Sequence, residues 1–381
     1  MQRQKLINYL GVLFLFISSI SYGQQNELQF KKILDSTYDK NQDAIGIMIH
    51  VEAPNENISW TYAVGSADKY GKEKIDKNQP VLIASNTKTY LSATILKLVE
   101  NKKLLLDQPI NNLLSEKTKK LLLKSGYSLD KITVRNLLSH TSGITDYVTD
   151  SYFSFVGKNP DHQWTRDEQI GLSMKIAKPL EPGKTFAYGD INYLLLSEII
   201  EKKTGKSFPI AIRDLLDFEK LNLNATWFVD LEKKPGNALA FAHQYSSTYG
   251  WDSFELNPSW DLYGGGGLAS TTKDLALFFQ YLFEGKIIKD KKTLSQIYTY
   301  SNPRETTNNY CLGLYNFPSF YGNTGYYHGG WWGTDVMYLP ELNTTISVFT
   351  LLKEKRDLNP EISHQIINVL KQSKLNNPKS K

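Results

Sequence analysis

The amino-acid sequence predicts an α+β fold, in which an antiparallel sheet with flanking helices is built from both ends of the chain and a mostly helical lobe is inserted between them. Runs rich in β-forming residues occur as two pairs near the two ends: 44–51 with 58–64, and 326–339 with 345–352. Turn-forming residues separate the members of each pair, which is typical of hairpins. The middle of the chain has mainly short helical patterns and loops.

Four stretches carry apolar residues at helical spacing and are predicted to be helices: 87–100, 133–138, 192–203 and 360–371. Gly205 follows the third stretch, and glycine is typical of the position just after a helix. The first helix begins directly after a β-like run at 81–84. We therefore expect Ser85 at or just before a helix N-terminus.

Residues 1–23 are predicted to be a cleavable signal peptide. Arg3 and Lys5 precede an apolar run at 10–20, and small polar residues follow it. This run has only about half of the ~20 apolar residues that a membrane-spanning helix needs. We expect a periplasmic or secreted protein with no membrane span once the signal is removed.

The remaining chain is longer than one hydrophobic core usually organises, so two lobes are expected. The sheet lobe is predicted from residues 24–100 and 260–375, and the helical lobe from residues 101–259. Residues 376–381 form a basic tail. The active site is expected between the two lobes.

Composition excludes several classes of function. A formal net charge of +5 over 381 residues is weak, so no nucleic-acid partner is expected. The six histidines show no spacing that would gather metal ligands. The glycine run at 264–267 lacks the Gly-Lys-Ser/Thr of a phosphate loop, and close backbone packing beside the site explains it better. No metal and no cofactor is predicted, the expected partner is a small-molecule or peptide substrate, and the oligomeric state stays open.

A Ser-x-x-Lys pattern occurs four times, at Ser66, Ser85, Ser128 and Ser270. On a helix this spacing puts an amine one turn from a hydroxyl, where it can activate a nucleophile. Only Ser85, with Lys88, lies between a β-like run and a strongly periodic helix. Orphan N–H groups at a helix N-terminus favour developing negative charge, so Ser85 is the predicted nucleophile.

Five segments, in order, resemble motifs of one family: the class C β-lactamases, DD-peptidases, D-aminopeptidases and related esterases. Residues 83–88 (IASNTK) resemble its first motif, and 182–193 (PGKTFAYGDINY) its Tyr-x-Asn motif with flanks. Residues 327–331 (YHGGW) resemble the third motif in its His-x-Gly form. Supporting matches are 135–143 (RNLLSHTSG) and 265–270 (GGGLAS). The resemblance covers most of residues 44–352 and implies the β-lactamase/transpeptidase-like fold.

The resemblance implies a role for each matching residue. Ser85 forms an acyl-enzyme, and Lys88 and Tyr188 share the proton transfers, with the acylation base left open between them. The backbone N–H groups of Ser85 and Trp331, which follows Gly330, form the oxyanion hole. His328 lines the cavity. His140, beside two serines, is expected to brace a turn.

Two positions depart from the family pattern. Asp190 stands where the family usually has Asn, and an ionised carboxylate only accepts hydrogen bonds. It is therefore expected to favour substrates with an amine or amide N–H near the scissile bond. His328 replaces the lysine of Lys-Thr-Gly, which supplies a fixed charge for a substrate carboxylate.

These observations predict an exported serine hydrolase that forms an acyl-enzyme with an amide or ester. Activity of the D-alanyl-D-alanine carboxypeptidase or peptidase kind, or esterase activity, is preferred. Two alternatives remain: a β-lactamase, and a catalytically silent protein that binds cell-wall peptides or a partner. Intact Ser85, Lys88 and Tyr188 argue against the silent protein.

Overall fold

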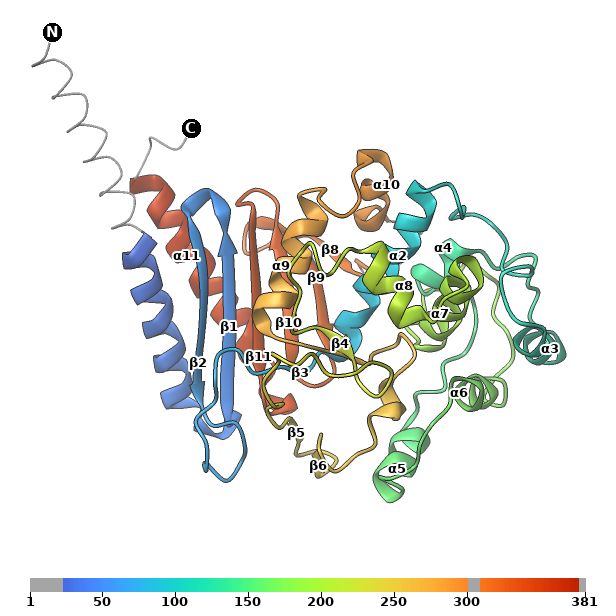
Figure 1. Ribbon diagram of the computed structural model, residues 1–381, viewed down its shortest axis with the longest axis horizontal. Helices are drawn as coiled ribbons and strands as arrows, with labels where there is room; N and C mark the ends of the chain where they lie inside the picture. The colour runs from blue at the N-terminus through green and yellow to red at the C-terminus, as the bar shows by residue number, and fades with distance from the viewer. Residues whose placement is uncertain (1–22, 301–308, 377–381) are drawn as a thin grey trace, which may run out of the picture.

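The computed structural model describes residues 23–300 and 309–376, and Figure 1 shows a large sheet on one side of the molecule and most helices on the other. The sheet has six strands in the order β2-β1-β11-β10-β9-β8, and each neighbouring pair is antiparallel. The bounds of the strands, in chain order, are Gly46–Ala53 (β1), Ile58–Gly65 (β2), Tyr315–Phe320 (β8), Asn323–Gly330 (β9), Thr334–Leu339 (β10) and Thr344–Thr350 (β11). The predicted antiparallel sheet built from both ends of the chain is confirmed.

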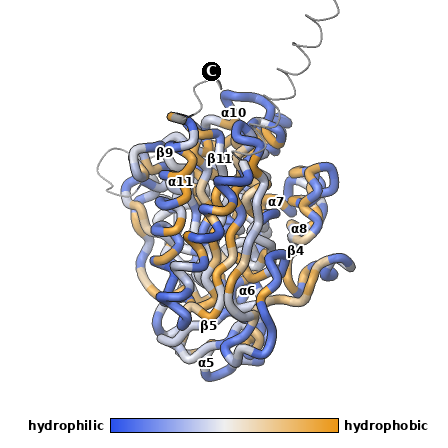
Figure 2. Tube along the Cα trace, turned by 90° about the vertical axis from the view of Figure 1, so that its left-hand side faces the viewer, coloured by the Kyte–Doolittle hydropathy of each residue, from blue (hydrophilic) through white to orange (hydrophobic). Residues whose placement is uncertain are grey.

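Helices from both ends of the chain cover one face of this sheet. Phe30 and Leu34, from a helix described over residues 23–40, share a buried cluster with Ile47 of β1 and with Ile362 and Ile366 of α11 (Leu358–Asn376). Apolar and polar residues alternate along α11 (Figure 2), as expected for a helix with one face on a sheet. Helix α9 (Thr272–Phe283) packs on the opposite face, against β1, β10 and β11.

The predicted strand at 326–339 is wrong in one respect, because it is two strands joined by a tight turn. Strands β9 and β10 pair with Gly330 opposite Thr334. Gly333 in this turn has a φ of +91°, and a Cβ there would lie 2.5 Å from the carbonyl oxygen of Thr350. The hairpin turn therefore depends on glycine at this position.

The middle of the chain is mainly helical, as predicted. Helix α2 spans Thr87–Glu100, and α7 spans Ile191–Thr204 and ends on left-handed Gly205. The other helices there are α3 (Glu116–Lys124), α4 (Val134–Leu138), α5 (Asp150–Lys158), α6 (Arg166–Ser173) and α8 (Phe208–Leu215), and α10 (Lys291–Ser295) follows α9. Short strands form two small sheets: β3 (Val81–Leu82), β7 (Leu268–Ser270) and β4 (Trp227–Phe228) in one, β5 (Tyr245–Ser246) and β6 (Trp251–Asp252) in the other.

The predicted signal peptide falls almost wholly on residues 1–22, and the basic tail on residues 377–381, which lie outside the described residues. Over 23–300 and 309–376, no helix has both the length and the apolar character that crossing a bilayer requires. The division into two lobes stays a prediction. Helix α2, assigned to the sheet lobe, packs against α7 and α8 of the helical part.

Candidate active site

Ser85 lies in a 3₁₀ turn, Ala84–Asn86, that runs directly into α2. Ala84 has a φ of +45°, a left-handed conformation that costs energy for a residue with a Cβ. The buried Asn86 holds the turn, because its amide donates to the Ile83 carbonyl oxygen at 2.9 Å and to Thr334 Oγ1 at 2.9 Å. A strained turn anchored to β10 thus places the predicted nucleophile at the start of a helix.

Lys88 is completely buried, and its ammonium contacts oxygen atoms of Ser85, Gly265 and Asp190. It donates to Ser85 Oγ at 2.8 Å and to the Gly265 carbonyl oxygen at 2.6 Å, and it forms an ion pair with Asp190 Oδ1 at 2.6 Å. Burial alone would lower the pKa of Lys88, but the charges of Asp190, Tyr188 and Asp261 outweigh it, so that the net shift is upward. Lys88 is therefore protonated in the resting site.

Tyr188 reaches the same group from the loop before α7. Its ring centroid lies 5.0 Å from Lys88 Nζ and 4.2 Å from the ring of His140. The backbone N–H of Gly189 donates to His140 Nδ1 at 3.2 Å, so His140 braces this loop, as predicted. Burial raises the pKa of Tyr188 to about 12, although Lys88 and a hydrogen bond with Ser85 oppose that shift. The phenol is therefore neutral at ordinary pH.

The other predicted residues lie at the end of β9. His328 is buried, and its Nε2 lies 3.3 Å from the hydroxyl of Tyr310. Burial, aided by the charge of Lys88, lowers the pKa of His328 to about 3, so the imidazole is neutral. Gly330 packs on the Ile83 backbone beside the nucleophile turn. This contact brings the start of the β9–β10 turn, and hence the Trp331 backbone, close to Ser85.

The Trp331 side chain is half-buried in a set of aromatic rings from separate elements. Its centroid lies 5.8 Å from Phe153 of α5, 5.9 Å from Tyr249 and 5.5 Å from Trp260. Trp332 is buried in the core, with 1 % of its surface exposed. Trp331 therefore presents an accessible face to the surroundings of Ser85, whereas Trp332 does not.

Gly330→Ala is expected to lower kcat by ~10²–10³-fold, the usual effect of losing one oxyanion donor. A Cβ at this position would lie 2.2 Å from Thr334 Oγ1 and 2.3 Å from the Ile83 carbonyl oxygen, so the hairpin must move away from the nucleophile turn. Steady-state hydrolysis of p-nitrophenyl acetate measures the loss. Gly171→Ala in α6 is the matched control, because a Cβ there meets nothing within 4 Å. Equal activity of the two variants would contradict the expectation.

Sequence reasoning missed two acidic residues that surround the Lys88–Asp190 pair. Asp146 accepts a hydrogen bond from the Ile191 backbone N–H at 3.1 Å, and burial together with the Asp190 charge raises its pKa to about 7. Burial and the same charge also raise the pKa of Asp261 well above its ordinary range. Glycines were the available signal, because a Cβ at Gly266 would lie 2.3 Å from Asp261 Oδ2 and a Cβ at Gly189 would lie 2.9 Å from Asp146 Cβ.

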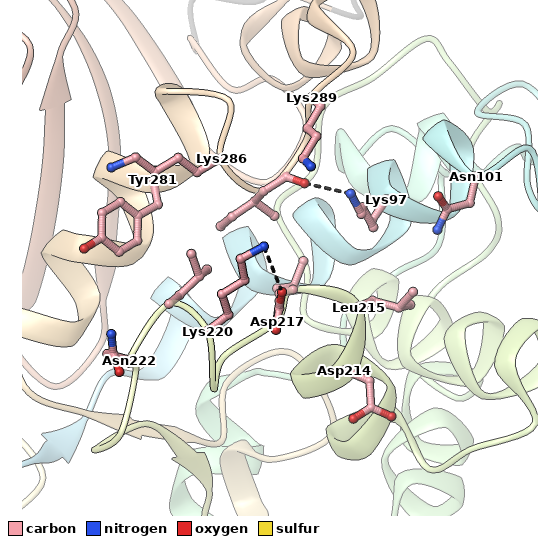
Figure 3. Close-up of a pocket in the computed structure, with 13 residues that line it drawn as sticks. Lys97, Asn101, Asp214, Leu215, Asp217, Lys220, Asn222, Tyr281, Lys286 and Lys289 are labelled. Atoms are coloured by element: carbon pink, nitrogen blue, oxygen red, sulfur yellow. Dashed lines mark hydrogen bonds and ion pairs between the residues drawn. The ribbon is translucent and has the colours of Figure 1, made fainter.

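A cavity of about 720 Å³ lies away from Ser85, between the ends of α2 and α8 and the segment before α10 (Figure 3). Several lysines line it, but Lys97 is bound by Glu100 at 2.6 Å and by the Ile287 carbonyl oxygen at 2.8 Å. Lys286 pairs with Glu284 at 2.8 Å. This cavity contains none of the predicted site residues and is not the catalytic centre.

The chain is similar to known proteins over most of its length. A family model described as Beta-lactamase matches residues 34–368. Penicillin-binding protein 4* of Bacillus subtilis (strain 168) is 23% identical over 353 residues, which cover 89% of this chain and 74% of that protein. The teichoic acid D-alanine hydrolase of Staphylococcus aureus is 26% identical over 311 residues, covering 81% and 71%.

Solved structures share the fold. The D-amino acid amidase from Ochrobactrum anthropi SV3, complexed with L-phenylalanine, matches with a TM-score of 0.78 and 22% identity, covering 92% of this chain and 99% of that chain. The family match extends over nearly all of the described fold and includes every predicted site residue. The chain therefore belongs to the beta-lactamase family and is a serine hydrolase.

Proposed function

We propose that this protein hydrolyses esters or amides of amino acids that carry a free amine, D-amino acids above all, through an acyl-enzyme on Ser85. The observation that carries the proposal is the charge around the nucleophile. The carboxylate of Asp190 lies beside Lys88, and the residue in the third motif is a neutral imidazole. Hydrogen-bond acceptors suit a substrate amine, whereas a substrate carboxylate needs a cation.

The basic side chains at β9 are poorly suited to bind a substrate carboxylate. His328 is neutral, and the guanidinium of Arg356, which lies against Gly329, is already paired with Asp335 at 2.7 Å. A D-alanyl-D-alanine carboxypeptidase and a β-lactamase both act on substrates with a free carboxylate. The carboxypeptidase and the β-lactamase are therefore second candidates.

Two further observations support the substrate class. A D-amino acid amidase and a teichoic acid D-alanine hydrolase are among the similar proteins, and both names specify D-amino acid derivatives. The rings of Trp331, Phe153 and Tyr249 offer an apolar wall beside the predicted oxyanion hole. We therefore expect D-phenylalanine derivatives to be better substrates than D-alanine derivatives.

In this proposal Ser85 is the nucleophile, and Tyr188 delivers a proton to the leaving group. The backbone N–H groups of Ser85 and Trp331 bind the oxyanion. We also propose export, on the strength of Arg3, Lys5 and the short apolar run that follows them.

Profiling the purified protein tests the proposal. D-phenylalanine amide, D-alanine amide, p-nitrophenyl acetate, a D-Ala-D-Ala peptide and nitrocefin are compared by kcat/KM. The amino acid amides are expected to lead, the D-Ala-D-Ala peptide to follow, and nitrocefin to turn over poorly. Rapid nitrocefin cleavage would show that the argument from His328 is wrong, and inactivity on every substrate would favour a silent binding protein.

A further inference from the structure

We infer that Asp190 is the terminal proton acceptor of a relay that runs from Ser85 through Lys88. The three groups are in direct contact: Lys88 Nζ lies 2.8 Å from Ser85 Oγ and 2.6 Å from Asp190 Oδ1. Lys88 is completely buried, and 14 % of the Asp190 side chain is exposed. Both distances are within the range for proton transfer along hydrogen bonds.

Because Lys88 is already an ammonium, a relay through it requires a further proton acceptor. An ammonium has three N–H donors, and Ser85 Oγ, Gly265 O and Asp190 Oδ1 provide three oxygen acceptors. A protonated amine cannot take a proton from Ser85 unless it gives one away. Asp190 is a carboxylate acceptor in direct contact with it, and the asparagine usual in the family could not perform this step.

The relay conserves protons and electrons at each step. As Ser85 Oγ bonds to the acyl carbon, the hydroxyl proton moves to Lys88 Nζ and a second proton moves from Lys88 Nζ to Asp190 Oδ1. The carbonyl π electrons become the oxyanion, Lys88 stays an ammonium and Asp190 becomes a neutral acid. When the tetrahedral intermediate collapses, the proton returns through Lys88 and Tyr188 to the departing oxygen or nitrogen, and the Asp190 carboxylate is restored.

Asp190 lies in a cluster of titratable groups. Titratable groups face it from several loops and helices: Lys88, Asp146, Tyr147, Tyr152, Tyr188 and Asp261. Neighbouring carboxyl groups increase one another's affinity for a proton, because two like charges cannot both ionise easily at close range. Burial and the charge of Asp190 together raise the pKa of Asp146 and of Asp261.

Asp190→Asn tests the relay on p-nitrophenyl acetate, which has no amine. The inference therefore rests on the serine hydrolase chemistry of the proposed function and not on its amino acid specificity. We expect kcat to fall by ~10²–10⁴-fold across the pH range with KM little changed, as for the loss of a general base. A proton inventory in mixed H₂O and D₂O should be curved for the wild type, with two protons in flight, and linear for the variant.

A different pH profile is expected if Asp190 takes no part in proton transfer. If Asp190 only raises the pKa of Lys88, Asp190→Asn will move the acid limb of the kcat/KM profile to lower pH and keep or increase the rate at neutral pH. That outcome would overturn the relay. Asp214→Asn is the matched control, since Asp214 also pairs with a lysine at 2.7 Å but is exposed. Wild-type hydrolysis of the ester, with no turnover of amino acid amides, would refute the proposed specificity and leave the relay standing.

Discussion

Replacing Ser85 with alanine is expected to lower kcat on every substrate by ~10⁴-fold or more, the usual result of removing a catalytic nucleophile. The hydroxyl is the atom that Lys88 contacts at 2.8 Å, and its loss removes the acyl-enzyme route. Labelling with a fluorophosphonate probe, followed by intact-protein mass spectrometry, should show one adduct on the wild type and none on the variant.

Ser128→Ala is the matched control for this prediction. Ser128 belongs to another Ser-x-x-Lys pattern, but it is exposed in a turn. Full activity and labelling are expected in this control. A Ser85→Ala variant that keeps either property would remove the basis for the assigned nucleophile.

Lys88→Met is expected to abolish turnover and also to destabilise the protein. Removing the cation leaves the largely buried Asp190 carboxylate unpaired beside Asp146 and Asp261, and losing one partner of a buried ion pair costs about 3–5 kcal/mol. The free energy of unfolding should be measured in urea from pH 5 to pH 9, together with ester hydrolysis.

The stability of the Lys88→Met variant is expected to fall as the pH rises. The pKa of Asp146 is already raised in the folded protein, to about 7, above its ordinary value of 3.8. Its contribution to stability is therefore fully present below about pH 4 and is lost as the pH rises through 7. The charge of Lys88 lowers the pKa of Asp146 and of Asp261, so without it both pKa values rise further, and the variant should lose more stability than the wild type between pH 5 and pH 9.

A double variant separates the effect on stability from the effect on activity. Lys88→Met with Asp190→Asn removes both charges of the pair, and we expect it to recover most of the lost stability while remaining inactive. Comparable instability of the single and double variants would show that the ion pair is not the source of the destabilisation.

Regular elements with strong local signals were predictable from the sequence. The 87–100 and 192–203 helices follow from apolar spacing, and in the second a glycine marks the end. The turn between β9 and β10 was missed because Trp331 and Trp332 continue an apolar run that is typical of a strand. Only Gly333 marks the turn, and a lone glycine also fits a strand with a bulge.

The site residues that belong to a sequence motif were predictable. The residues that only tertiary packing brings to the site were not. Ser85, Lys88 and Tyr188 were named from their motifs. Asp146, in a loop, and Asp261, at the end of the short 3₁₀ helix Pro258–Asp261, are single acids, and nothing in their spacing indicates that they meet at Lys88. The direct ion pair between Asp190 and Lys88 likewise depends on the placement of two helix N-termini relative to each other, which one sequence does not reveal.

The pairing of β1 with β11 has a consequence for the order of folding. Ile47 pairs with Thr350, and Ser373 donates to Asn26 Oδ1 at 2.6 Å, so the first and last described segments stabilise one another. Until the last strands are available, the β1–β2 hairpin has an open edge, and such long-range pairing forms slowly. During synthesis the sheet therefore cannot close around β1 until β11 is available.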